Sequence, residues 1–153
     1  MTTDDPDPLS QLRITVTDGR GRPRTERGLV PWVTRGAPRA ARGEFTIALV
    51  GDRKMRELNH RFRGIKRVTD VLSFPADQGA PAVGDVRLLG DVVIATGRAA
   101  RQARAAGWTN GQELKRLTLH GLLHLLGYDH EHDDGEMERL ERRLRRRGGL
   151  PSE

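Results

Sequence analysis

The stretch His120-Gly121-Leu122-Leu123-His124-Leu125-Leu126-Gly127-Tyr128-Asp129-His130 is the segment from which the rest of the chain is best understood. Residues 117–126 are apolar on nearly every face and predict a buried helix. Within that helix His120 and His124 are separated by about 40° of rotation, so both imidazoles leave the same face. Gly127 can adopt a positive φ and predicts a chain reversal just beyond the helix. We expect the reversal to bring His130 back toward the pair.

Three converging imidazoles predict a zinc site, with one ion per chain, on His120, His124 and His130. Three protein ligands and one open position are typical of catalytic zinc. The spacing is that of the metzincin proteases, but those enzymes carry a glutamate directly after the first histidine as general base. Gly121 has no group that takes a proton, so the pattern disfavours peptide hydrolysis and favours phosphodiester cleavage. The residues alone leave open a metal-free helix whose histidines bond backbone carbonyls.

The composition restricts the class of protein. The chain has 153 residues and a net charge of +6, which favours nucleic acid as a partner. It has no cysteine, which excludes disulfides, thiolate zinc sites, iron–sulfur clusters and cysteine nucleophiles. No apolar run reaches the roughly 18–20 residues of a membrane span. Residues 1–10 are acidic and contain proline, unlike a signal or transit peptide, so we expect a cytoplasmic protein.

The periodicity of apolar residues predicts a small α+β domain at residues 11–148, between tails at 1–10 and 149–153. Strands are expected at 12–17, 44–50, 69–74 and 91–95, and helices from 29 and over 53–62, 96–106, 110–126 and 133–147. This order predicts a small mixed sheet packed with helices around the buried, histidine-bearing helix. The strand at 91–95 should be central. Asp52 should cap the helix that follows it, and Trp32 and Met137 should lie in the core.

Four segments together resemble the bacterial YbeY endoribonucleases. The histidine motif at 120–130 resembles the signature of that family. The Glu57-Leu58-Asn59 and Phe62-Arg63-Gly64 stretches, the Thr69-Asp70-Val71-Leu72-Ser73-Phe74-Pro75 block and the Leu89-Gly90-Asp91-Val92-Val93-Ile94 strand match it in the expected order.

The resemblance implies a zincin-like α+β fold and a metal-dependent, single-strand-specific endoribonuclease. It implies action in 3′-end maturation of 16S ribosomal RNA and in ribosome quality control, with RNA and the ribosome as partners rather than DNA or a membrane. It implies zinc on the three histidines and a catalytic role for Arg63, whose guanidinium suits bidentate phosphate binding. Two alternatives stay open: a non-catalytic ribosome-assembly factor stabilised by its metal, and a metallopeptidase.

Further basic residues are candidates for RNA contact. Lys66 and Arg67 follow Arg63, and Arg142, Arg143 and Arg146 lie in the arginine-rich half of the last helix. Each of these groups is also compatible with an ordinary solvated surface. Asp70 and Asp91 are candidates to orient an imidazole, although both residues also fit structural positions beside strands. Asp129 fits a turn better than a proton acceptor.

Overall fold

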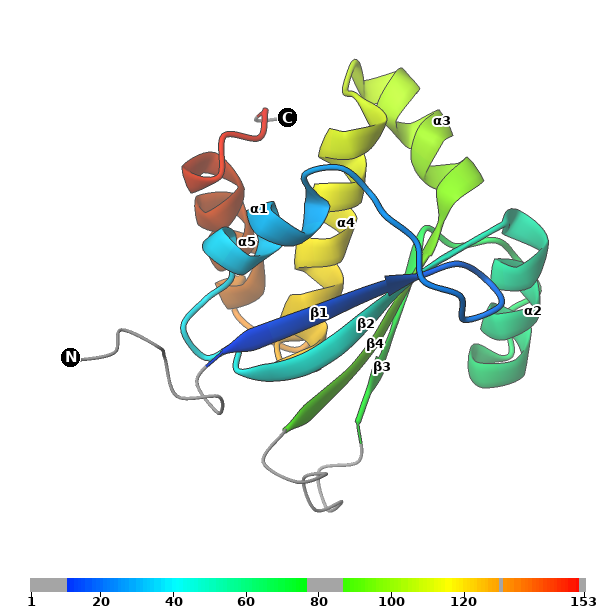
Figure 1. The fold of residues 1–153 in the computed structure, drawn as a ribbon, viewed down its shortest axis with the longest axis horizontal. Coiled ribbons are helices and arrows are strands. Elements are labelled where there is room, and N and C mark those ends of the chain that lie inside the picture. The colour runs from blue at the N-terminus through cyan, green and yellow to red at the C-terminus, as the bar shows by residue number, and fades with distance from the viewer. Residues whose placement is uncertain (1–10, 77–86, 130, 152–153) are drawn as a thin grey trace.

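The computed structural model describes residues 11–76, 87–129 and 131–151, which form a four-stranded sheet and five helices (Figure 1). The predicted tail at 1–10, most of the predicted loop at 76–84, and His130 lie outside these ranges. The order of strands and helices along the chain is the one expected from the sequence. No helix in the described ranges has the length and apolar character needed to cross a membrane.

The sheet is mixed, as predicted. Its strands β1 (Leu12–Thr17), β2 (Gly43–Val50), β3 (Val71–Pro75) and β4 (Leu88–Ala95) lie in the order β1-β2-β4-β3. The strands β1, β2 and β4 are parallel, and β3 runs antiparallel at the edge beside β4. The expected central strand is therefore an interior one, β4. It begins at Leu88, earlier than predicted, because pairing with β2 and β3 extends it beyond its apolar stretch.

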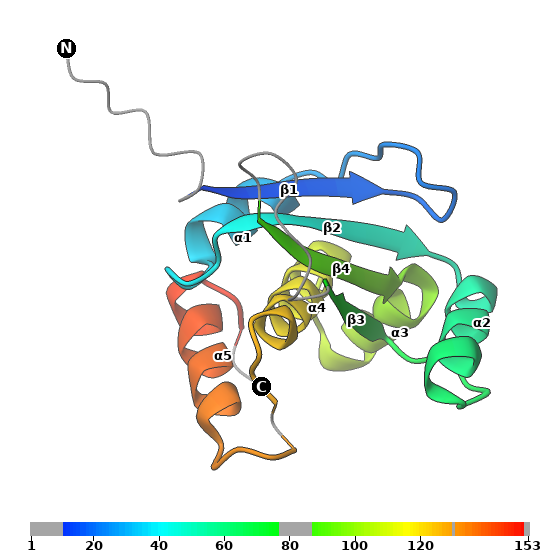
Figure 2. The ribbon, with the colours of Figure 1, turned by 90° about the horizontal axis from the view of Figure 1, so that it is seen from below.

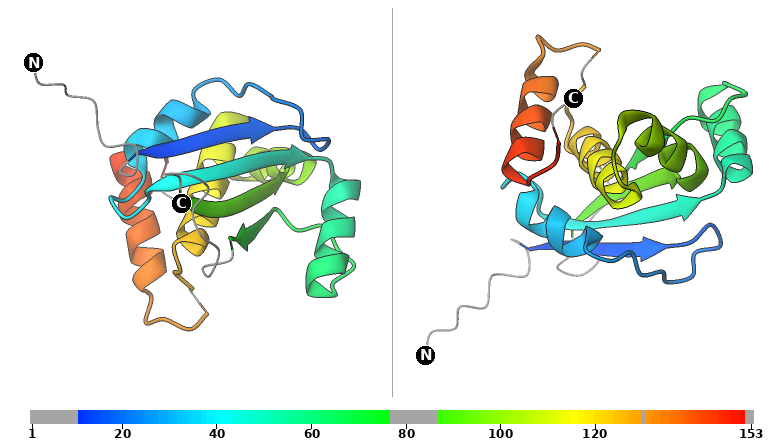
Figure 3. Two further views of the ribbon diagram at one scale, coloured as in Figure 1. Left: turned by 60° about the horizontal axis from the view of Figure 1, so that its bottom comes forward. Right: turned by 90° about the horizontal axis from the view of Figure 1, so that it is seen from above.

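Helices cover the two faces of this sheet unequally. The helices α1 (Leu29–Gly36), α3 (Thr96–Ala106), α4 (Asn110–Leu125) and α5 (Glu136–Arg147) contribute to one core with Phe45, Ile47 and Leu49 of β2. On the other face, α2 (Asp52–Arg63) contributes to a smaller core at one end of the sheet (Figures 2 and 3). The two cores follow from the alternation of side chains along each strand.

Helix α4 is the centre of the larger core, as its sequence predicts. Nine of its residues are buried, and its first turn is fixed by a capping box in which Thr109 and Gln112 bond each other's backbone N–H groups. Trp32 and Met137 are buried in the same core, as expected. Trp32 Nε1 also donates to the carbonyl of Gly148 at 2.9 Å. Leu150, beyond the predicted domain boundary at 148, packs in this core too.

Asp52 does not cap α2, so that expectation was wrong. The N-cap residue of α2 is Gly51. Asp52 instead accepts from the backbone N–H of Arg98 at 3.2 Å and from Nη2 of Arg101 at 2.8 Å, in the first turns of α3. The helices α2 and α3 follow the parallel neighbours β2 and β4, so both begin at the same edge of the sheet. A carboxylate at the start of one helix therefore reaches the free N–H groups of the other.

Helix α5 begins at Glu136, three residues later than its predicted start at Asp133. The Asp133 carboxylate accepts from the backbone N–H groups of Gly135 at 2.8 Å and Met137 at 2.9 Å. Asp133 therefore lies before the helix and stabilises its first turn by accepting from N–H groups that have no partner within the helix. The same bonds hold the residue outside the helix, because its side chain takes the place of a backbone acceptor.

Candidate metal centre

His120 and His124 point toward each other from one face of α4. Their Nε2 atoms are 3.2 Å apart and their ring planes are inclined by 75°. If each Nε2 atom bonded one zinc ion at about 2.05 Å, the N–Zn–N angle would be about 103°, close to the tetrahedral value of about 109°. The pair as it stands thus fits two ligands of one zinc ion. The proposed third ligand, His130, lies outside the described residues.

Glu141 of α5 orients the first histidine. Its carboxylate oxygens lie 3.1 and 3.3 Å from Nδ1 of His120. A carboxylate only accepts, so Nδ1 carries the proton and Nε2 keeps its lone pair directed at His124. Burial opposes ionisation of Glu141, but the hydrogen bond from His120 and the charges of Arg145 and Arg116 outweigh it and lower the pKa of Glu141. This is the arrangement that metal-binding histidines commonly have.

Sequence reasoning missed Glu141 and considered Asp70 and Asp91 for this role. Asp91 instead lines a groove with Val93 and Phe74, which belong to the smaller core or pack against it. A signal for Glu141 was present, because it occupies the apolar stripe of α5 between Met137 and Leu144. All three residues are buried, and a carboxylate in a buried stripe requires a partner.

Gly121 faces the sheet rather than the pocket. A Cβ atom built on Gly121 would lie 2.6 Å from Cγ1 of Val92 and 3.1 Å from Oγ of Ser73. Ser73 also donates from Oγ to the Gly121 carbonyl at 3.1 Å, which ties the edge strand β3 to α4. The close approach of helix and sheet therefore requires glycine here. It also leaves no room for the glutamate that a zinc peptidase carries after its first histidine.

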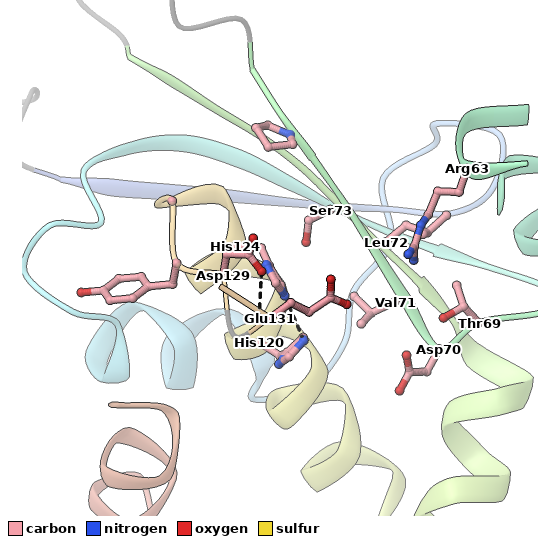
Figure 4. Close-up of a pocket in the computed structure, with 13 residues that line it drawn as sticks. Arg63, Thr69, Asp70, Val71, Leu72, Ser73, His120, His124, Asp129 and Glu131 are labelled. Atoms are coloured by element: carbon pink, nitrogen blue, oxygen red, sulfur yellow. Dashed lines mark hydrogen bonds between the residues drawn. The ribbon is translucent and has the colours of Figure 1, made fainter. Parts of the chain in front are cut away.

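The histidine pair opens into a cavity of about 550 Å³ between α4, β3 and the end of α2. Arg63 lines the same cavity, and Figure 4 shows its side chain reaching in from the side opposite His120 and His124. Arg63 is the last residue of α2, where Gly64 adopts a φ of 72° and its N–H bonds the carbonyl of His60. The structure thus brings Arg63 and the two histidines, far apart in sequence, to one cavity.

The other basic candidates occupy two separate surfaces. Lys66 and Arg67 are exposed in the loop after Arg63, which is held by a 2.9 Å bond from Asn59 Nδ2 to the Arg67 carbonyl. On α5 the predicted residues Arg142, Arg143 and Arg146 are exposed, and Arg142 pairs with Glu138 at 2.7 Å.

Helical rotation separates the arginines of α5 from the histidines. Glu141 faces His120, and Arg143 and Arg146 leave the helix about 200° and 140° away from it. Arg145 is rotated by only about 40°, is half-buried, and its charge contributes to the lowered pKa of Glu141. Arg143 and Arg146 therefore lie on the side of the helix that faces away from the metal centre, and Arg142, about 100° from Glu141, lies on its flank.

Asp129, Glu131 and His132 form an exposed cluster whose ligand atoms lie within 4.8 Å of one another. Asp129 accepts from the backbone N–H of Glu131 at 3.0 Å, in agreement with a turn-forming role. Its other oxygen contacts Nδ1 of His132 at 2.6 Å, and this hydrogen bond lowers the pKa of Asp129 and raises that of His132. These residues offer donors for a cation at the rim of the cavity, but exposed clusters of this kind are common without one.

Comparison with known proteins places this arrangement in a family. The model of the family described as Endoribonuclease YbeY matches residues 30–148, a range that includes both histidines, Arg63 and Glu141. The chain belongs to the YbeY endoribonuclease family. The resemblance inferred from the sequence segments is confirmed, and the family name denotes nucleases that cut within RNA.

Two YbeY proteins and one solved structure are similar to this chain. Endoribonuclease YbeY of Solibacter usitatus is 46% identical over 129 residues, covering 84% of this chain and 78% of the relative. The protein of the same name from an Anaeromyxobacter species is 52% identical over 112 residues, covering 72% of this chain and 57% of the relative. The solution structure of TM1509 from Thermotoga maritima has a TM-score of 0.56 and 28% identity, covering 86% of this chain and 85% of that one.

Proposed function

We propose that this chain is a zinc-dependent, single-strand-specific endoribonuclease that acts in 3′-end maturation of 16S ribosomal RNA and in ribosome quality control, in the cytoplasm. The endoribonuclease class follows from the family. The dependence on zinc is supported by one observation above all: two imidazole nitrogens 3.2 Å apart, the first set in its tautomer by Glu141, at a cavity that an arginine also lines.

The residues present divide the work of phosphodiester cleavage. His120, His124 and His130 would hold zinc, which when bound would supply a Lewis acid at the phosphate and lower the pKa of a water molecule to about 7. Arg63 binds the RNA phosphate and stabilises the charge that develops on its oxygens, because a guanidinium stays charged at every working pH. Glu141 keeps the proton of His120 on Nδ1. Ser73 holds β3, and with it the wall of the cavity, against α4.

The close packing at Gly121 argues against the metallopeptidase alternative. A peptidase of this motif needs a carboxylate beside the metal, and Val92 occupies the space where the side chain of residue 121 would begin. Phosphodiester cleavage depends mainly on positive charge around the phosphate, which Arg63 and the proposed zinc would provide at a cavity that Asp70, Asp129 and Glu131 also line.

The test is cleavage of an end-labelled single-stranded RNA and of its duplex by protein of known zinc content. The wild type should cut the single strand and spare the duplex. His124→Ala should lose both zinc and cleavage, and Arg63→Ala should keep zinc and lose cleavage. Arg61→Ala is the matched control, because Arg61 is exposed on the same last turn of α2 but is not part of the cavity wall.

The same experiment separates the alternatives. Equal cutting by the wild type and His124→Ala would show that the cleavage comes from a contaminating nuclease. Zinc-loaded wild type that cuts no RNA, together with rescue of ribosome assembly by His124→Ala, would establish the non-catalytic assembly factor instead. The rRNA role itself is tested by sequencing 16S 3′ ends from cells whose only copy of the protein carries Arg63→Ala, where unprocessed ends should accumulate.

A further inference from the structure

A second cavity of about 400 Å³ adjoins the metal cavity on the side of α3. Asp70, drawn among the pocket residues in Figure 4, lines both cavities. The other walls are Gln102 and two alanines of α3, Trp108 in the connection between α3 and α4, and Glu113 and Arg116 of α4. Because Asp70 borders both spaces, the two cavities are neighbours.

A fixed polar network forms the floor of this second cavity. Glu113 is 3% exposed, and its carboxylate accepts two bonds from Arg116, with Nη2 at 3.0 Å, and one from Gln102 Nε2 at 2.9 Å. Gln102 Nε2 also donates to Oδ2 of Asp70 at 3.2 Å. Among the residues that the structure describes, this is the one donor to the Asp70 carboxylate, so Oδ1 of Asp70 is available to a ligand.

The chemistry of the walls selects a neutral, planar ligand. Asp70 and Glu113 bring two negative charges, and the single positive charge of Arg116 is already paired with Glu113, so the site repels phosphate. Trp108 is half-buried and lines the cavity with an aromatic side chain, beside the small side chains of Ala105 and Ala106 in the same lining. The parts of an RNA strand that are uncharged, planar and carry N–H donors are its bases.

We propose that this second cavity is a nucleobase subsite, in which a base of the RNA strand stacks on Trp108 while Oδ1 of Asp70 accepts a hydrogen bond from an amino group of the base. The proposal rests on the proposed function, since it assigns the nucleotide next to the phosphate held at Arg63. It implies a preference for amino-bearing bases over uracil. Cytosine and uracil have the same ring size and differ at position 4, where cytosine carries an amino group and uracil a carbonyl oxygen.

The experiment measures binding of fluorescently labelled oligo(C) and oligo(U) of equal length to zinc-loaded protein by anisotropy. The wild type should bind oligo(C) more tightly. Trp108→Ala should weaken both by roughly 5- to 150-fold, the range for loss of one base stack. Asp70→Asn should remove most of the preference, because an amide also donates to the O4 acceptor of uracil. Arg104→Ala, on the exposed side of α3, is the control and should match the wild type.

Three results would overturn the subsite. The first is a folded Trp108→Ala protein that binds both oligonucleotides as the wild type does. If Trp108→Ala does not fold, Trp108→Leu is used instead, because leucine fills the space without an aromatic face. Unchanged binding by the leucine variant would overturn the subsite equally. The second is a preference that Asp70→Asn leaves intact. The third is wild type that binds neither oligonucleotide, which would overturn the proposed function as well. In the first two cases, RNA cleavage by the wild type would show that the subsite alone is overturned.

Discussion

The contact between Glu141 and His120 leads to a prediction about zinc affinity. Replacing Glu141 by glutamine keeps the shape of a buried side chain but removes the charge that favours a proton on Nδ1. The amide oxygen of glutamine accepts a weaker hydrogen bond than a carboxylate does. In the opposite amide orientation, the NH2 group faces the Nδ1–H of His120, and two donors form no hydrogen bond. Loss of such a partner costs about 10- to 100-fold in metal affinity, or about 1.4–2.7 kcal/mol. We expect Glu141→Gln to weaken zinc binding by this factor.

The assay is competition for zinc against a chromogenic chelator, with thermal unfolding of the metal-free protein measured in parallel. Glu138→Gln is the matched control: it is the same substitution one turn earlier on α5, at an exposed side chain that pairs with the exposed Arg142. The control should change zinc affinity less than twofold. Wild-type zinc affinity in Glu141→Gln, or an equal loss in both variants, would refute the assignment of Glu141 as the partner that orients His120.

Three further predictions concern stability and pH. Gly121→Ala should destabilise the protein by about 1–3 kcal/mol in denaturant unfolding, because its Cβ would meet Val92 at 2.6 Å and the packed sheet has little room to move; an unchanged midpoint would contradict this. Thr109→Ala should cost about 0.5–2 kcal/mol through loss of the cap that bonds Gln112, whereas Thr109→Ser should retain most of that stability. Asp91 is exposed but lies in a groove where partial desolvation raises its pKa, so its ionised form weakens the fold slightly above that pKa and the cost is absent below the pKa of the unfolded chain. Asp91→Asn should therefore raise the melting temperature slightly at pH 7, with the difference from wild type vanishing near pH 3.

The amino-acid sequence determined the local features of this protein. The order of helices and strands follows from the spacing of apolar residues along the chain. In each helix this spacing extends over only one or two turns, so it is a local property of the sequence. The common face of His120 and His124 is likewise a property of helical geometry, whereas the 3.2 Å approach of their Nε2 atoms also depends on the orientation that Glu141 gives the ring of His120. Thr109 and Gln112 close the start of α4 through a motif four residues long.

The tertiary structure decided whatever depends on which elements become neighbours. Asp52 serves α3 rather than its own helix because two parallel strands end side by side. Glu141 reaches His120 across the contact between α5 and α4, 21 residues along the chain. The apolar stripe of α5 indicates that Glu141 is buried, but only the packing of α5 against α4 decides that its partner is His120. The position of Arg63 opposite the histidines, and the network that joins Gln102 to Glu113, depend in the same way on the packing of helices against the sheet. Helical periodicity is encoded by residues close in sequence, whereas a site is assembled by burial of apolar faces over the whole domain, and that burial is a collective property of the chain.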